Sequence, residues 1–357
     1  MSFAPLVAAA VLSTALLAQQ PTRPTAPPAP QEPATRPAVL YSTRGDQRVH
    51  MLSLPDLKPL WAYEAGAGAH ELAISADGRW AIGSAYGGPG PGHEPADNRV
   101  FVLDLPSGLR SRTIDLGASK RPNDLAFLGT TSVAVVTTEQ PPQLLRLDAL
   151  TGEFEAFALE HPANHMLALA GDGSACFVSH VLPGGVTRFD LTKNEVTKFN
   201  GLPVGAEGIC CVGEGAAMRL WIACNRTDRL LVVDANTLKV EHSVARGGFP
   251  LRVKASPHGT YVAVSCPKTR TVVVYDAKDV SKAQTVDLSQ ATTADQQPTS
   301  LAWAPDNGTL LVMANGEMDR IVTIDALTAK TIGYSIADGP IADALVAGMV
   351  LPPPPKR

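Results

Sequence analysis

Residues 298–325 read PTSLAWAPDNGTLLVMANGEMDRIVTID, and this stretch contains three strand-like segments in order. Thr299–Trp303 is apolar, a Pro-Asp-Asn-Gly turn follows it, Leu310–Ala314 is a second apolar segment, and Arg320–Asp325 alternates before a closing aspartate. A fourth, more polar segment lies around residues 331–334. Short apolar segments separated by Gly, Pro, Asn and Asp predict β-strands joined by tight turns. The stretch therefore predicts one four-stranded antiparallel unit with its polar strand at the edge.

The third segment of this unit recurs seven times along the chain, at intervals of 42 to 51 residues. The residues that close the seven copies are Ser53, Asp104, Asp148, Asp190, Asp234, Asp276 and Asp325. Helical repeats of similar length would show apolar residues at a spacing of 3.6, which these segments lack. A period near 42 with several strands per unit is typical of propeller blades. The predicted fold class is all-β, a seven-bladed β-propeller of four-stranded antiparallel blades.

The two ends of the chain complement each other in this repeat. Val39–Thr43 matches a second strand and Val49–Ser53 a third, with no first strand before them. Gly339–Val346 matches the start of a first strand, with no second strand after it. Placing the C-terminal strand in the first blade removes the open edge of the ring. We therefore predict that the first blade is closed by the C-terminal strand.

The N-terminal residues have the composition of an export signal. Residues 1–18 are largely apolar, the apolar core is short for a membrane span, and a small residue lies at the predicted cleavage edge. Because no Lys or Arg precedes this core, an uncleaved anchor or a misassigned start are the alternatives. We expect a signal peptide over 1–18, a Pro-rich linker over 19–37, the propeller over 38–347 and a Pro-rich tail over 348–357. The expected location is the periplasm, the cell envelope or the extracellular space, with no membrane span in the mature chain.

Charge and cysteine content exclude several classes of partner and site. The 30 basic residues are scattered among 34 acidic ones, for a net charge of −4, so we expect no nucleic-acid binding. The five cysteines lie in or beside apolar segments and show no zinc or haem spacing, which predicts buried thiols. We expect a monomer whose partner is a small molecule or another protein.

The repeat also carries a family resemblance. The order Pro-x-x-Leu-Ala, then Asp-Gly, then an aromatic-Val-like strand, then Val-x-Val-x-Asp resembles the YVTN-repeat β-propellers, best over 250–276 and 298–325. This resemblance covers nearly all of 38–347 and implies a seven-bladed bacterial or archaeal protein of the cell surface, periplasm or envelope. It implies no single function. Some related propellers are lactonases or lactonising enzymes, and gluconolactonase-type propellers hold a divalent ion in the channel.

The repeat phase gathers polar residues at one mouth of the predicted channel. In a propeller the first strands line the channel, so residues that precede each first strand and residues that end each second strand converge there. His165, Glu207 and Arg252 come from three consecutive blades at such positions, and His180 ends a second strand. Arginine can anchor a carboxylate while Glu or His carries a proton. These three residues are the candidate catalytic set, loosely similar to the His, Glu and Arg of lactonising propellers.

Further candidate ligand-binding residues lie at equivalent positions or in the longest loop, 86–98, which could overhang the mouth. They are His70, Glu71, Asp124, His180, His93 and Asn315. An alternative interpretation gives His70, Glu71, Asp124, His165 and Glu207 to a divalent metal ion. A purely structural role, in which these groups are solvated or bond to a neighbouring blade, also stays open. The leading hypothesis is an exported binding or scaffold protein, and the alternative is a lactonase-like or lactonising enzyme.

Overall fold

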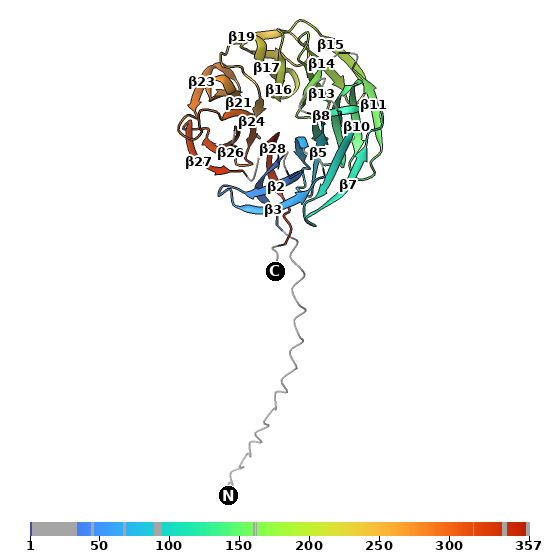
Figure 1. Cartoon of the computed structure of the whole chain (residues 1–357), viewed down its shortest axis with the longest axis vertical. Helices are drawn as coiled ribbons and strands as arrows, with labels where there is room; N and C mark the ends of the chain where they lie inside the picture. Colours follow the sequence, from blue (N-terminus) through green and yellow to red (C-terminus); the bar gives the residue numbers. More distant parts are fainter. Residues whose placement is uncertain are drawn as a thin grey trace. The chain divides into compact units, whose positions relative to one another are not determined.

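The computed structural model describes residue 1 and residues 34–43, 46–66, 69–88, 95–159, 161, 163–316, 318–337 and 341–354. Its strands form seven four-stranded antiparallel sheets, arranged as the blades of a ring (Figure 1). The innermost strand of each blade contacts the innermost strands of the blades on either side. The seven-bladed β-propeller predicted from the repeat is therefore confirmed.

The blades are numbered in chain order, and their strands are given from the channel outward. Blade 1 contains β28 (Ile341–Val350), β1 (Arg36–Thr43), β2 (Arg48–Ser53) and β3 (Pro59–Glu64); blade 2 contains β4 (Ala69–Ile74), β5 (Trp80–Ala85), β6 (Arg99–Asp104) and β7 (Leu109–Asp115); blade 3 contains β8 (Lys120–Phe127), β9 (Val133–Gln140), β10 (Pro142–Asp148) and β11 (Phe154–Ala158); blade 4 contains β12 (Asn164–Leu169), β13 (Ala175–His180), β14 (Gly185–Asp190) and β15 (Glu195–Phe199).

The remaining blades follow the same order. Blade 5 contains β16 (Ala206–Val212), β17 (Arg219–Cys224), β18 (Arg229–Asp234) and β19 (Val240–Ala245); blade 6 contains β20 (Val253–Ala255), β21 (Tyr261–Cys266), β22 (Thr271–Asp276) and β23 (Asp279–Asp287); blade 7 contains β24 (Gln297–Trp303), β25 (Thr309–Asn315), β26 (Arg320–Asp325) and β27 (Lys330–Ile336). Three single-turn 3₁₀ helices, η1 (Gly215–Ala217), η2 (Asn225–Thr227) and η3 (Pro267–Thr269), lie in the connections.

Burial explains why the third strand of each blade carries the clearest sequence signal. The four central residues of β18 are all buried, because a blade in the ring packs against a neighbour on each of its faces. Such strands are apolar at successive positions rather than at every second one. The outermost strand β15 has four exposed residues out of five, and its sequence is correspondingly polar.

Aspartates that close the third strands stabilise the following turns. The Oδ1 atom of Asp148 accepts hydrogen bonds from the backbone N–H groups of Leu150 at 2.8 Å and Thr151 at 3.1 Å. The same pattern recurs at Asp190 and Asp234. These carboxylates serve turn geometry, as the sequence predicted.

All five cysteines are free thiols, and most are buried, which is the part that the sequence predicted. Cys211 is half-buried, whereas Cys176, Cys210, Cys224 and Cys266 are buried. Burial raises the pKa of the Cys266 thiol to about 11, so this group is not a thiolate at neutral pH. Separately, no helix in the described part of the chain is both long and apolar enough to span a membrane.

The ring closes through the two ends of the described chain, as predicted. β28 pairs with β1 in antiparallel register, with Leu345 opposite Tyr41 and Val350 opposite Arg36. The chain then reaches blade 2, where the Leu351 N–H donates to the Gly78 carbonyl at 2.8 Å. Gly78 has a φ of +69°, and a Cβ there would lie 2.3 Å from the Met349 carbonyl oxygen. Only glycine fits this turn beneath the closing strand.

Removing residues 341–357 should strongly destabilise the protein. The truncation exposes one edge of β1 and removes the buried side chains of Leu345 and Val350, which together contribute about 5 kcal/mol. In a protein of this size we expect the midpoint of thermal unfolding to fall by about 10 °C or more. Circular dichroism of the truncated and full chains measures this, with removal of residues 355–357 alone as the control. Equal midpoints for the long truncation and the control would contradict the closure.

Candidate functional site

Polar side chains gather at the channel mouth formed by the starts of the inner strands and the ends of the second strands. Antiparallel pairing joins these positions, with Asn164 opposite His180 in blade 4 and Ala206 opposite Cys224 in blade 5. The second strands of blades 4 to 7 end at the residues that the repeat phase predicted. Convergence at one mouth therefore follows from the strand order of the ring.

His165 is at the centre of this cluster, between two carboxylates. Its Nε2 atom lies 3.3 Å from Oε1 of Glu207, and its Nδ1 atom lies 3.9 Å from Oε1 of Glu139 and 3.0 Å from Nδ2 of Asn123. The side chains of His165, Glu207 and Glu139 are 17%, 18% and 11% exposed, so the cluster is largely desolvated but reachable from the channel.

The two carboxylates hold His165 in its charged form. Burial alone would lower the pKa of His165, but the hydrogen bonds and charge of Glu139 and Glu207 outweigh it and raise this pKa to about 9. Burial likewise opposes ionisation of both glutamates, yet contacts that include His165 keep their pKa values below the usual range. At neutral pH the trio carries one positive and two negative charges.

Neighbouring donors fix both glutamates in place. The Tyr86 hydroxyl donates to Oε2 of Glu139 at 2.7 Å, and Nδ2 of Asn123 donates to Oε1 of the same residue at 3.2 Å. The side-chain amide of Asn225 donates to Glu207. Blades 2, 3, 4 and 5 thus contribute to one continuous hydrogen-bond network. Carboxylates satisfied in this way are pre-oriented for a ligand.

Arg252 is engaged in a buried ion pair on the same side of the ring. Its Nη2 atom lies 2.6 Å from Oε1 of Glu71, and both side chains are 5% exposed. Its Nη1 atom lies 2.6 Å from the Sδ atom of Met166. The sequence suggested that Arg252 anchors a ligand carboxylate, whereas in the structure its charge is already balanced by Glu71. This pair joins blade 6 to blade 2 across the ring.

Two other candidate residues have structural partners away from His165. Asp124 is 5% exposed and accepts the backbone N–H groups of Leu125 at 2.8 Å and Leu167 at 2.9 Å. His180 is fully buried, where its Nε2 atom lies 2.7 Å from Oγ1 of Thr187 and its ring stacks on His161 at 3.8 Å between centroids. Within the described part of the chain, neither contacts the His165 imidazole directly.

The last three candidates lie around the edge of the cluster. The ring of His70 packs against the ring of Tyr86 at 4.7 Å, which places it one contact away from Glu139. Asn315 is half-buried at the end of β25 in blade 7. His93 lies among residues 89–94, outside the described residues. His165 and Glu207 are thus the predicted residues that the structure brings into direct contact, together with the separate pair of Arg252 and Glu71.

The residues proposed for a divalent metal do not form a metal site in the described ranges. No three His, Cys, Asp or Glu side chains of residues 34–354, apart from the gaps noted above, lie close enough to hold one ion. The two ring nitrogens of the charged His165 already face Glu207 and Glu139. We assign no metal ligands at this mouth.

Sequence reasoning missed three members of the network. Glu139 and Asn225 each lie one residue beyond Thr138 and Cys224, the predicted ends of the second strands in blades 3 and 5, and Tyr86 is the first residue of the loop 86–98, in which the sequence singled out His93. Extending the second strands of blades 3 and 5 by one residue would have found Glu139 and Asn225. In blade 3 the strand itself continues to Gln140, which carries Glu139 over the mouth.

Comparison with known proteins supports the fold but does not assign a function. No protein-family model matches the chain, and no curated protein is similar to it in sequence. A functionally unknown protein from Desulfotomaculum acetoxidans is similar in structure, with 15% identity and a TM-score of 0.68 over 88% of this chain and 99% of that one. Hydrazine synthase of Kuenenia stuttgartiensis matches with 14% identity and a TM-score of 0.61, over 72% of this chain and 76% of that one. At such identities the similarity shows the fold alone.

The buried His180 should make the protein less stable in mild acid. Burial, with smaller contributions from His161 and Lys198, lowers the pKa of His180 to about 3. Below the unfolded value of about 6.5 the unfolded chain therefore binds a proton that the folded chain excludes. Stability that is present above pH 6.5 is lost as the pH falls toward 3.

We expect His180→Phe to flatten the decline of the urea unfolding midpoint between pH 6 and pH 4. The substitution removes the titrating group and keeps a ring beside His161. The control is His242→Phe, which changes an exposed histidine on β19. In this variant the urea unfolding midpoint should decline with pH as steeply as it does in the unmodified protein. Identical slopes for His180→Phe and the unmodified chain would show that His180 is protonated as easily in the folded state as in the unfolded state.

Proposed function

We propose that the protein is a binding module that holds a small ligand at the channel mouth through His165, Glu139 and Glu207. The observation that supports this most directly is a charged trio that is pre-oriented by neighbouring blades and still partly exposed. A purely structural cluster has no need to leave its charged atoms accessible. Function in propellers depends on such sites rather than on the fold.

The charge of the trio favours a ligand that carries a positive charge. One imidazolium and two carboxylates give the trio one net negative charge, and the Arg252 guanidinium that lowers the pKa of Glu207 is itself paired with Glu71. An ammonium group can restore balance and donate hydrogen bonds to Glu139 and Glu207, since ionised carboxylates accept several. We therefore propose a small amine as the ligand class. This differs from the carboxylated ligand that the sequence suggested.

We also propose that the protein acts outside the cytoplasm and is related to the YVTN-repeat propellers. Support for export comes from the apolar residues 1–18 and the seven prolines of residues 21–37, and support for the family comes from the repeat motif. A periplasmic or surface location would give the channel mouth access to small molecules from the surroundings.

Binding of amines tests the proposed function. Isothermal titration calorimetry at pH 7 would use putrescine, spermidine and glucosamine, with glutarate as an anionic comparison. We expect at least one amine to bind, and Glu207→Gln to weaken that binding by about tenfold, or roughly 1.4 kcal/mol, since a charge-assisted hydrogen bond is lost. Glu195→Gln changes an exposed residue of β15 and serves as the control. Binding of glutarate and of no amine would contradict the proposal.

Lactone hydrolysis is the second candidate function, favoured by the contact between His165 and Glu207. A charged His165 can donate a proton, but a glutamate with a lowered pKa is a weak base toward water. We therefore expect no turnover above background for a panel of aliphatic and aromatic lactones followed by pH-indicator assay. Turnover by the unmodified protein that Glu207→Gln abolishes, and Glu195→Gln retains, would establish the enzyme instead.

A further inference from the structure

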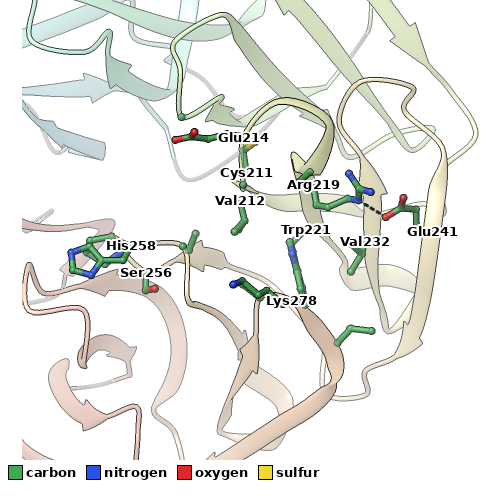
Figure 2. Close-up of a pocket in the computed structure, with 18 of the residues that line it drawn as sticks. Cys211, Val212, Glu214, Arg219, Trp221, Val232, Glu241, Ser256, His258 and Lys278 are labelled. Atoms are coloured by element: carbon green, nitrogen blue, oxygen red, sulfur yellow. Dashed lines mark hydrogen bonds and ion pairs between the residues drawn. The ribbon is translucent and has the colours of Figure 1, made fainter.

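A cleft of about 1000 Å³ opens between blades 5 and 6 (Figure 2). It is bordered by the β12–β13, β16–β17 and β20–β21 turns, which follow the C-terminal ends of inner strands. The His165 cluster lies at the N-terminal ends of these strands. The cleft is therefore a separate site, and its volume is within the range of sites for small molecules.

The cleft exists because one repeat position lacks a large side chain. This position is the last residue of the inner strand that pairs with the second strand. In blades 2 to 7 its partner lies seven residues later in the sequence, so the six positions are equivalent. These residues are Ile74, Phe127, Leu169, Val212, Ala255 and Trp303. Blade 6 alone among them has alanine, and Ala255 lines the cleft.

The next interface shows what a large side chain does at this position. Trp303 of blade 7 stacks on Tyr261 of blade 6, with ring centroids 6.1 Å apart and planes at 16°. Its indole N–H donates to the Lys254 carbonyl at 3.0 Å, and its side chain fills the interface with 6% exposure. Between blades 5 and 6, Arg219 corresponds to Tyr261 and Cys211 to Lys254. The space that an indole ring fills in one interface is thus open in the other.

Apolar side chains form part of the wall of the cleft. Val212 and Trp221 line it, and the buried indole N–H of Trp221 has no acceptor within the described part of the chain. A buried indole N–H is ordinarily paired. This nitrogen is itself inaccessible and the Trp221 side chain is 1% exposed, so Trp221 contributes packing beneath the wall rather than a donor to the cleft.

The distribution of charge around the cleft favours a ligand whose acidic group lies at the Lys278 side. The Arg219 guanidinium contacts Glu241 and lies 3.4 Å from Asp234, so two carboxylates outweigh its single positive charge, although its face can still stack on a ring. Lys278 is exposed and forms no ion pair with any residue that the structure describes. Glu214 projects from the hairpin on the other side of the opening from Lys278 (Figure 2). An anionic group would thus lie toward Lys278.

We propose that this cleft binds a planar aromatic acid. The ring occupies the space beside Ala255 that Trp303 fills in the next interface, against Val212 and the Arg219 guanidinium. The carboxylate lies toward the Lys278 ammonium. An indole-sized ring with one carboxylate combines both features, and the site is independent of the amine site at the channel mouth.

Indole-3-acetate is a suitable probe, and its binding can be measured by isothermal titration calorimetry. We expect Ala255→Trp to abolish binding while the midpoint of thermal unfolding stays the same or rises, because the new ring repeats the packing of Trp303. Lys278→Gln should weaken binding by about tenfold, as expected for loss of a charge-assisted contact. Lys282→Gln is the control, because it changes an exposed lysine of β23 outside the cleft. This variant should bind indole-3-acetate with the affinity of the unmodified protein.

Two comparison ligands separate the ring from the charge. Cyclohexylacetate keeps the carboxylate without the aromatic plane, and tryptophol keeps the indole without the charge, so both should bind at least about fivefold more weakly. The proposal is overturned if indole-3-acetate does not bind at 5 mM (about 3 kcal/mol of affinity), or if folded Ala255→Trp binds it normally. If Ala255→Trp does not fold, two other results together overturn the proposal. These are an unchanged affinity of Lys278→Gln for indole-3-acetate and equal affinities of the unmodified protein for all three ligands. Glu207→Gln should leave this binding unchanged, which distinguishes the cleft from the channel mouth.

Discussion

Pairing between β28 and β1 is the constraint on which the arrangement of the whole ring depends. Each blade buries both faces against its neighbours, so an unclosed ring would expose the apolar faces of its first and last blades. The C-terminal strand completes blade 1 and continues to the Gly78 turn of blade 2. Because this strand comes from the far end of the chain, its pairing with β1 fixes the spacing of the inner strands. The geometry of both ends of the channel follows from that spacing.

Buried charges add a second set of long-range connections at the mouth. Arg252 and Glu71 are 181 residues apart in sequence and meet at 2.6 Å with 5% exposure each. Removing one partner of such a pair typically costs about 3–5 kcal/mol, because the other charge is left buried and uncompensated. The pair therefore specifies how blades 2 and 6 face each other. The His165 trio of the same mouth keeps a net negative charge that a ligand can balance.

Strand order and blade phase were predictable from the sequence, whereas side-chain partners were not. All seven third strands end at the predicted residue, from Ser53 to Asp325, because burial on both faces imposes an apolar run and the turn imposes a polar closing residue, which is aspartate in six of the seven. The same phase placed His165 and His180 near one mouth. It carried no information about side-chain direction, which rotamers and neighbours determine. His180 therefore stacks on His161 inside blade 4, while His165 reaches Glu207 of blade 5.

The repeat also explains how two different sites can arise on one scaffold. Equivalent positions in successive blades have nearly the same backbone environment, so a change of residue type at one of them alters one interface and leaves the others intact. Where the position carries Trp303 the interface is filled, and where it carries Ala255 a cleft remains. At the mouth, the residue after the second strand donates a hydrogen bond to the His165 network in blades 2 and 5, and the equivalent residue of blade 3 is the carboxylate of Glu139, within β9. Deviation from the repeat, rather than the repeat itself, is thus the feature that locates candidate sites in this protein.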